Sequence, residues 1–307
     1  MAKVLVTGGA GFIASALAHR LALESNEVVI VDNLLTGKKS NIPSHPAIRF
    51  VKCDVNDFND LAGVFYAGGF DFVFHYAALV GVQRTLDNPV KVLHDMDGIR
   101  NVLQLSKATG VKRVFFASSS EVYGEPFEIP QNERTTPLNS RLPYAIVKNA
   151  GEAWLRAYQK EYGLDFTIFR FFNTYGPQQS DDFVISRFMK AALANEPIHI
   201  YGDGQQTRTF CYIDDNIEAC YRIFSRDLYI NDVVNIGADE ELTILHVANV
   251  VKEICKSTSP IVHLPALAEG DMSRRKPDIT NMKAVLGAHP RDLYAGLTNL
   301  LSAQNLK

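Results

Sequence analysis

An apolar, β-branched run that ends in closely spaced glycines and continues with helical spacing constrains this 307-residue chain more than any other feature. Residues 3–6 have the composition of a buried strand, and apolar residues recur at helical intervals over 12–23. Between these segments, Gly8, Gly11 and Ala14 follow the spacing G-x-x-G-x-x-A. Small residues permit a tight turn, and the N–H groups that begin the helix then face an anion. The segment predicts a pyrophosphate-binding turn; the alternative is a tight turn without a ligand.

The alternation of strands and helices continues beyond this unit. Strand-like apolar runs cover residues 28–31, 48–51, 72–74, 113–117 and 166–170, and helix-like spacing covers 57–65, 89–108 and 144–162. This alternation predicts an α/β fold, a doubly wound parallel sheet with both faces covered. After residues 176–177 turn residues become denser, which predicts a smaller C-terminal lobe. We expect one domain from residues 1–175 and about 213–238, and a substrate-binding lobe from about 176–212 and 239–307.

Composition argues against several classes of protein. Hydrophobic residues make up 47% of the chain and the net charge is −3, which disfavours a disordered chain and a nucleic-acid-binding protein. The four cysteines lack metal-ligand spacing, so we expect no metal site and no disulfide framework. No apolar run reaches the length of a membrane span, and the N-terminus has no signal-peptide pattern. We therefore expect no membrane association and a cytoplasmic location.

Acidic residues at two strand ends favour a particular dinucleotide. Asp32 ends the second expected strand, where a carboxylate accepts hydrogen bonds from an adenosine ribose and repels a 2′-phosphate. That position favours NAD over NADP, although Asp32 and Asn33 also fit a plain turn. Asp54 and Val55 follow the third strand, where they either contact adenine or simply end the strand.

A tyrosine and a lysine four residues apart, Tyr144 and Lys148, share one face of the expected helix 144–162. A lysine ammonium favours the phenolate and is expected to lower the pKa of the tyrosine, which can then accept a proton from a substrate hydroxyl. The preceding strand ends in Ser118, Ser119 and Ser120, whose hydroxyls can hydrogen-bond the reacting oxygen. Alone, the pair is equally typical of a surface helix, and the serines of a polar loop.

Seven ordered motifs together resemble the extended short-chain dehydrogenase/reductase family, specifically its NAD-dependent nucleotide-sugar epimerases, dehydratases and decarboxylases. They are T-G-G-A-G-F-I from Thr7, H-Y-A-A from His75, S-S-S-E-V-Y-G from Ser118, Y-A-I-V-K from Tyr144, R-F-F-N-T-Y-G-P from Arg170, Y-G-D-G-Q-Q-T-R from Tyr201 and R-R-K-P-D-I from Arg274. The resemblance covers almost the whole chain. It implies a Rossmann domain that binds NAD, a lobe that binds a nucleoside-diphosphate sugar, here expected to be UDP-linked, and a homodimer formed through helices 89–108 and 144–162.

The resemblance also assigns roles to individual residues. Tyr144 is implied to be the catalytic base and Lys148 its partner on the nicotinamide ribose. The implied catalytic set is Tyr144, Lys148, Ser119 and Glu121. The implied cofactor-binding residues are Gly8, Gly11, Phe12, Ile13, Asp32, Asn33, Asp54, Val55, Ala77, Ala78, Tyr144 and Lys148. The implied substrate-binding residues are Ser120, Asn173, Arg208, Arg274 and Arg275, of which Arg208 also fits a surface ion pair.

Three positions depart from the family pattern. Ala14 replaces a glycine, and Asp95 stands where many relatives carry an asparagine. Ala268 stands where many C4-epimerases have a diphosphate-binding arginine, a role that Arg274 or Arg275 can take over.

The motifs leave two reactions open, and both begin with transfer of a hydride from C4 of the sugar to NAD. A C4-epimerase needs no further acid or base, so epimerisation is our first expectation. Glu121 together with Arg275 resembles UDP-glucuronate decarboxylases, with Arg275 on the sugar carboxylate, and decarboxylation is the alternative. Ser120 stands where 4,6-dehydratases have an aspartate, which argues against dehydration. The intact Tyr144–Lys148 pair argues against a non-catalytic NAD sensor, and a simple ketoreductase is the remaining alternative.

Overall fold

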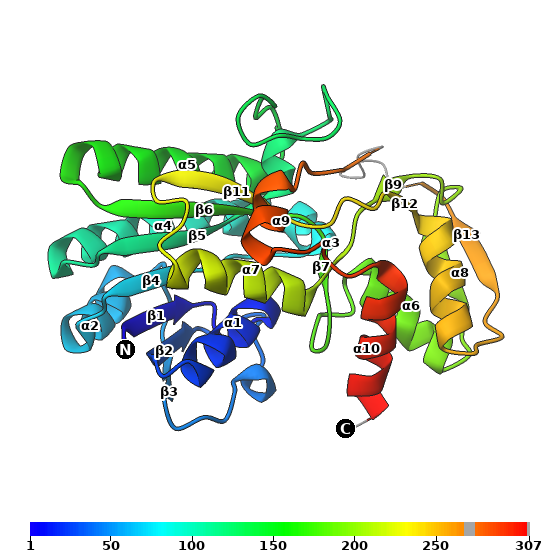
Figure 1. Cartoon of the computed structure of the whole chain (residues 1–307), viewed down its shortest axis with the longest axis horizontal. Coiled ribbons are helices and arrows are strands. Elements are labelled where there is room, and N and C mark those ends of the chain that lie inside the picture. The colour runs from blue at the N-terminus through cyan, green and yellow to red at the C-terminus, as the bar shows by residue number, and fades with distance from the viewer. Residues whose placement is uncertain (267–273, 306–307) are drawn as a thin grey trace.

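The computed structural model describes residues 1–266 and 274–305. Seven parallel strands form its central sheet in the order β11-β6-β5-β4-β1-β2-β3 (Figure 1). The strands are β1 (Lys3–Thr7), β2 (Glu27–Asp32), β3 (Ile48–Lys52), β4 (Phe72–His75), β5 (Arg113–Ser119), β6 (Asp165–Phe171) and β11 (Asp232–Ile236). The strand order reverses between β1 and β4, and a ligand crevice opens at the carboxyl ends of the strands at such a point. The predicted doubly wound parallel sheet is confirmed.

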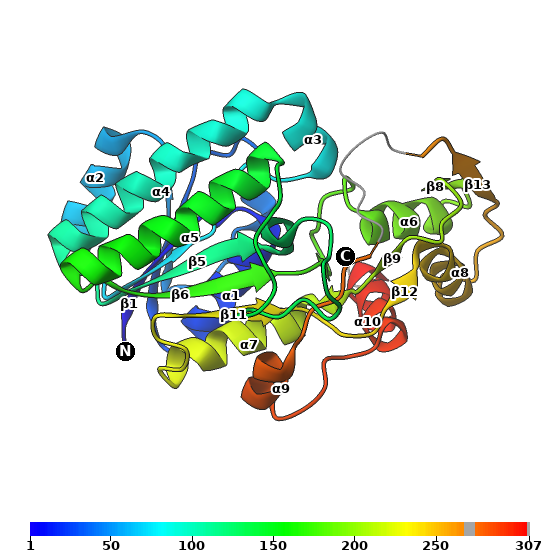
Figure 2. The ribbon, with the colours of Figure 1, turned by 90° about the horizontal axis from the view of Figure 1, so that it is seen from above.

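Helices cover both faces of the sheet because each buried strand presents apolar side chains in both directions. In β1, Val4 and Val6 pack on one face while Leu5 packs on the other. One face carries α2 (Phe58–Gly68), α4 (Pro89–Thr109) and α5 (Pro143–Tyr162), which lie side by side in Figure 2. The opposite face carries α1 (Phe12–Leu23), α7 (Ile213–Ser225) and α9 (Thr280–Leu286). The short helix α3 (Val82–Asp87) and two 3-10 turns, η1 (Lys39–Asn41) and η2 (Ser120–Tyr123), follow β4, β2 and β5.

A smaller lobe lies beyond the carboxyl ends of the strands, at the right of Figure 1. Its helices are α6 (Val184–Leu193), α8 (Ile244–Ile254) and α10 (Leu293–Asn305), and its strand pairs are β8 (Ile198–Tyr201) with β13 (Ile261–Leu264) and β9 (Thr207–Arg208) with β12 (Leu242–Thr243). A further pair, β7 (Thr174–Tyr175) with β10 (Cys211–Tyr212), links the two parts. The sequence assigned all of 239–307 to the lobe, but α9 packs against α7 and β11 on the sheet side.

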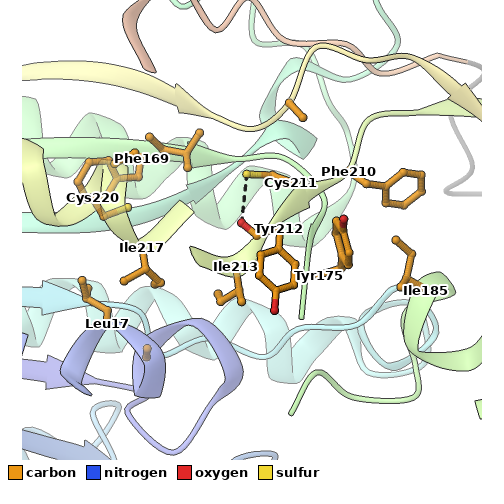
Figure 3. Packing of buried hydrophobic residues seen from close by; sticks show 14 of the residues in the cluster. Leu17, Phe169, Tyr175, Ile185, Phe210, Cys211, Tyr212, Ile213, Ile217 and Cys220 are labelled. Carbon is orange, nitrogen blue, oxygen red and sulfur yellow. Dashed lines mark hydrogen bonds between the residues drawn. The ribbon is translucent and has the colours of Figure 1, made fainter. Parts of the chain in front are cut away.

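One apolar cluster joins the sheet to the lobe. Figure 3 shows Leu17 and Phe169 at the sheet end of this cluster and Tyr175, Phe210 and Ile185 at its lobe end. These side chains are almost completely buried, so the sheet and the lobe share one hydrophobic core. Close packing in this core fixes the position of the lobe relative to the sheet. None of the described helices combines the length and apolarity needed to cross a membrane.

Candidate active site

The predicted site residues meet in one cavity of about 700 Å³ at the carboxyl ends of the strands. Every residue assigned to catalysis, cofactor or substrate in the sequence analysis lines this cavity, with the exception of Arg274. The sheet contributes the glycine turn and the ends of β2, β4 and β5, and the lobe side contributes residues such as Asn173, Arg208 and Arg275. The volume lies in the range of ligand-binding pockets in proteins.

The glycine turn brings backbone N–H groups to the cavity wall. Gly8 has a φ of +69°, and a Cβ at this position would lie 2.7 Å from the backbone nitrogen of Ala77. The N–H of Gly11 donates to the carbonyl oxygen of Gly8 at 2.9 Å, which closes the turn. Gly11 is the N-cap of α1 and offers no capping side chain, so the first N–H groups of α1 are available to an anion. The geometry fits a pyrophosphate.

A buried threonine and histidine fix the turn against β4. Oγ1 of Thr7 accepts hydrogen bonds from the N–H groups of Tyr76 and Ala77, both at 3.1 Å, and lies 2.8 Å from Nδ1 of His75. Burial lowers the pKa of His75 to about 3, so the ring is neutral. Because Oγ1 of Thr7 already accepts two N–H groups, its own proton is available to Nδ1 of the ring. The contacts of Thr7 and His75 therefore fix the short distance between the backbones of Gly8 and Ala77 in the cavity wall.

The acidic residues at the strand ends lie beside the turn. One carboxylate oxygen of Asp32 accepts the Ala10 N–H at 3.1 Å, and the other accepts the Leu34 N–H at 2.7 Å. The side chain of Asn33 donates to Asp54 at 3.0 Å, which joins the ends of β2 and β3. Asp32 thus makes the turn that the sequence allowed and also lines the cavity. Its role toward a ribose stays a prediction.

Tyr144 and Lys148 line the cavity from the first two turns of α5. This helix begins at Pro143, because the ring of proline fixes φ near the helical value. Nζ of Lys148 donates to the carbonyl oxygen of Ala117 at 2.7 Å and lies 5.7 Å from the centre of the Tyr144 ring. The hydroxyl of Ser119 lies beside the Tyr144 phenol, where it opposes the rise of the phenol pKa, and it accepts the N–H of Glu121 at 3.2 Å. The phenol and this hydroxyl can therefore hold one substrate oxygen between them.

Burial shifts the pKa values of this pair in opposite directions. It raises the pKa of Tyr144 above its ordinary value, with contributions from Glu121 and Asp95, while Ser119 and Arg275 oppose the shift. It lowers the pKa of Lys148 to about 8. The sequence predicted a lowered pKa for Tyr144, but the groups of the chain itself raise it. The loss of water around the phenol has a larger effect on its pKa than the nearby positive charges have. The ammonium of Lys148 points toward the Ala117 carbonyl oxygen.

A buried ion pair occupies the catalytic end of the cavity. Nη2 of Arg275 lies 2.9 Å from Oε1 of Glu121, and the two side chains are only 8% and 16% exposed. The other oxygen of Glu121 is buried without a hydrogen-bond partner among the described residues. Arg275 is held there by its neighbours, because the Gln131 N–H donates to Lys276 and the Asp278 N–H donates to Gln131, each at 2.8 Å.

Two predicted residues, Ser118 and Arg274, form contacts that the sequence did not indicate. Ser118 lines the cavity but donates to the buried carboxylate of Glu152 at 2.7 Å, so Ser119 is the serine that meets Tyr144. Arg274 lies on the surface, where its guanidinium forms two hydrogen bonds of 2.7 Å with Glu241. The arginine facing the cavity is therefore Arg275. Ala268 lies outside the described residues.

The cavity also contains residues to which the sequence analysis gave no role. Asp95 lines it from α4, and Arg187 lines it from α6, with its Nε buried and without a hydrogen-bond partner in the described part of the chain. Tyr201 and Gln206 belong to the quoted Y-G-D-G-Q-Q-T-R motif, which is the signal that could have found them. The segment 79–86 has no motif that predicts its place in the wall.

Comparison with known proteins identifies the family. Residues 4–237 match the NAD dependent epimerase/dehydratase family. The chain belongs to this family. A UDP-N-acetyl-alpha-D-glucosaminuronate decarboxylase from Bacillus cytotoxicus is 38% identical, over 94% of this chain and 92% of that protein. The crystal structure of a Thermotoga maritima UDP-glucose 4-epimerase with UDP-glucose is 31% identical, with a TM-score of 0.93 over 99% of this chain and 100% of that one. A Thermus thermophilus UDP-glucose 4-epimerase in complex with NAD is 30% identical, with a TM-score of 0.89 over 98% of each chain.

The epimerase/dehydratase family uses NAD, and the residues present fit this cofactor. The positive φ of Gly8 and the uncapped start of α1 suit the pyrophosphate, and Lys148 and Asp32 line the same cavity. The protein is therefore an NAD-dependent enzyme of nucleotide sugars, an epimerase or a decarboxylase.

Proposed function

We propose that the protein is a UDP-uronate decarboxylase, which oxidises C4 of the sugar and releases the C5 carboxylate as CO2. The observation that carries this proposal is the buried Arg275 guanidinium, 2.9 Å from Glu121 at the catalytic end of the cavity. Glu121 offsets the cost of burying this guanidinium. A guanidinium carries five N–H donors in a planar fork, so it can bind a second carboxylate beside Glu121. A uronate supplies such a carboxylate, whereas a neutral sugar does not.

The chain's residues divide the work of this reaction. Tyr144 accepts the O4 proton while Ser119 hydrogen-bonds O4. NAD, when bound beside Lys148, would supply the hydride acceptor for C4 and the donor for its return, and its positive charge would favour the phenolate form of Tyr144. The ketone at C4 makes the sugar a β-keto acid, which Arg275 holds until its C–C bond breaks and CO2 leaves. Tyr144 and Ser119 then donate hydrogen bonds to the enolate oxygen, and C5 takes up a proton. The net reaction consumes one proton, releases one CO2 and leaves NAD unchanged.

Two sequence relatives named as decarboxylases support this proposal. The Bacillus cytotoxicus relative is named as a decarboxylase of a UDP-linked uronate, and it matches along almost its whole length. Zebrafish UDP-glucuronic acid decarboxylase 1 is 36% identical over 94% of this chain. On this similarity we propose a UDP-linked uronate as the substrate. The experiment below determines which substituent the sugar carries at C2.

C4-epimerisation, the first expectation from the sequence, is the second candidate. Solved structures similar to this chain include UDP-glucose 4-epimerases, and Tyr144, Ser119 and Lys148 suffice for that reaction. It requires that the 4-keto sugar turn over within the cavity and take up hydride on its other face.

The experiment separates the two candidates by product mass. Purified protein is incubated with UDP-glucuronate, UDP-N-acetylglucosaminuronate, UDP-glucose and UDP-galactose without added cofactor, and the products are analysed by mass spectrometry. We expect loss of CO2 from a uronate, abolished in Arg275→Gln. Arg274→Gln is the matched control, because its side chain lies outside the cavity. An isobaric product from a neutral sugar, unaffected by Arg275→Gln, would establish the epimerase instead.

We further propose a homodimer formed through α4 and α5. Leu93 is 43% exposed and Trp154 is 37% exposed, so both are open to a second copy. Leu103 of the same helix α4 is 1% exposed and belongs to the core. Sedimentation of the wild type and of Trp154→Glu tests the dimer, which we expect the variant to weaken.

A further inference from the structure

A completely buried asparagine lies where two segments of the active site meet. Asn235 stands near the carboxyl end of β11. Its amide nitrogen donates to the carbonyl oxygens of Gln131 at 2.9 Å and Asp278 at 3.2 Å. Its amide oxygen accepts the hydroxyl proton of Tyr123 at 2.7 Å. One amide group therefore joins the end of η2 to two segments that are distant from it in the sequence.

The segments joined in this way carry the two members of the buried ion pair. Tyr123 is the last residue of η2, the turn that contains Glu121. Asp278 follows Arg275 by three residues, and its N–H donates to the Gln131 carbonyl oxygen at 2.8 Å. The amide is therefore bonded within three residues of each group that forms the 2.9 Å contact at the catalytic end of the cavity.

The surroundings of Asn235 hold its side chain in one orientation. Its backbone N–H donates to Oε1 of Glu133 at 2.9 Å, and the same oxygen accepts a hydrogen bond from the side chain of Asn281 at 3.1 Å. The Tyr123 hydroxyl accepts a hydrogen bond from the buried Arg170 guanidinium at 2.9 Å, so its own proton is free to go to Asn235. With two carbonyl acceptors on one side and this O–H on the other, the two ends of the amide cannot exchange places.

We propose that Asn235 is a positioning residue for decarboxylation, which holds Glu121 and Arg275 in one position relative to each other. A fully satisfied buried polar network specifies a single arrangement of the segments that it joins. The groups that oxidise C4, Tyr144 and Lys148, are carried instead by α5. The effect on CO2 release rests on the proposed function, whereas the connection between the two segments rests on the hydrogen bonds alone.

The first test compares the two halves of the reaction in Asn235→Leu, which removes the amide and keeps the approximate volume of the side chain. Single turnovers with UDP-glucuronate and with UDP-N-acetylglucosaminuronate, each at saturation, follow reduction of bound NAD at 340 nm together with release of CO2. We expect the rate of reduction to stay close to that of the wild type. Release of CO2 is expected to be slower by about 10²-fold, because a displacement of about 1 Å at a reacting centre has a cost of this order.

The second test measures hydrogen exchange of the backbone by mass spectrometry and does not need turnover. In Asn235→Leu, faster exchange is expected both in η2 and in residues 274–281. Tyr123→Phe removes one hydroxyl and is expected to speed exchange in η2 more than in residues 274–281. This milder variant tests the same connection if the leucine variant does not fold.

The matched control is Asn231→Ala, which removes an amide at the other end of the same strand. The side chain of Asn231 donates to Asp165 at 2.7 Å and accepts the N–H of Phe166 at 3.0 Å, so it joins β11 to the start of β6. We expect this variant to be less stable than the wild type. Its ratio of CO2 release to NAD reduction and its exchange in η2 and in residues 274–281 are expected to be unchanged.

Exchange at the wild-type rate in both segments of Asn235→Leu would overturn the proposal, as would wild-type exchange in η2 of Tyr123→Phe. Equal slowing of NAD reduction and CO2 release in Asn235→Leu would also overturn it, because the effect would then be general damage to the fold. A wild type that releases no CO2 from either uronate would reject the proposed decarboxylase. In that case the exchange measurements would still decide whether Asn235 holds the two segments, so the two failures are distinguishable.

Discussion

Substitution of Glu152 by Gln removes the charge at the centre of a buried network while keeping the volume of the side chain. Arg170 donates to the two oxygens of Glu152 at 2.9 and 2.7 Å, and both side chains are at most 3% exposed. Ser118 donates a third hydrogen bond to the same carboxylate. In Glu152→Gln the guanidinium of Arg170 stays buried without its counter-charge. Breaking such a pair costs about 3–5 kcal/mol, a large part of an ordinary free energy of unfolding.

Urea unfolding followed by tryptophan fluorescence measures this cost, because the single tryptophan, Trp154, lies on the same helix α5. The matched control is Arg156→Gln, which removes a guanidinium that is 4.0 Å from the same carboxylate but 51% exposed. We expect that control to change the free energy of unfolding by less than about 1 kcal/mol. The double variant Glu152→Met with Arg170→Met, which removes both charges, is expected to recover much of the loss. The reasoning is refuted if Glu152→Gln costs no more than Arg156→Gln.

The remaining predictions concern the cofactor, the chemical step and acid stability. Gly8→Ala forces a side chain into a left-handed φ and against Ala77, so about 1–2 kcal/mol of strain is expected to reduce NAD affinity about tenfold, measured by calorimetry. Tyr144→Phe is expected to slow reduction of bound NAD by UDP-sugar, followed at 340 nm, by about 10²–10⁴-fold, and an unchanged rate would assign the base elsewhere. His75 has a pKa of about 3 in the folded protein, so its contribution to stability is complete above the unfolded pKa near 6.5 and is lost as the pH falls toward 3. Between pH 6.5 and 4.5 the wild type is expected to lose about 2 kcal/mol more than His75→Gln in urea unfolding, and equal losses would contradict the assigned shift.

The sheet could be predicted from the sequence because its signals are local. The helical spacing over 12–23 coincides with α1, and the five further strand-like runs each fall within a strand of the sheet. Gly8 and Asp32 could be assigned because strand ends, where a parallel sheet gathers its ligand-binding residues, are visible in the pattern. Tyr144 could be assigned because its spacing from Lys148 places both on one face of a helix.

Distant contacts account for what the sequence did not predict. The choice between Arg274 and Arg275 depends on which side chain faces the cavity, and this is fixed by the pairing of the neighbouring backbone with Gln131. The direction of the Tyr144 pKa shift was wrong because burial of the phenol is a property of the folded cavity, whereas the spacing of tyrosine and lysine is a property of the sequence.

The attachment of residues 274–279 to Gln131 has a consequence for how such an enzyme diversifies. The groups that oxidise C4 are carried by the sheet and α5, whereas Arg275 is carried by a separate segment held through two backbone hydrogen bonds. Substitutions in that short segment can therefore redirect the fate of a shared intermediate while the oxidising machinery stays under purifying selection. One ancestral scaffold can in this way yield descendants with different products, each separated from the next by a few substitutions in that segment.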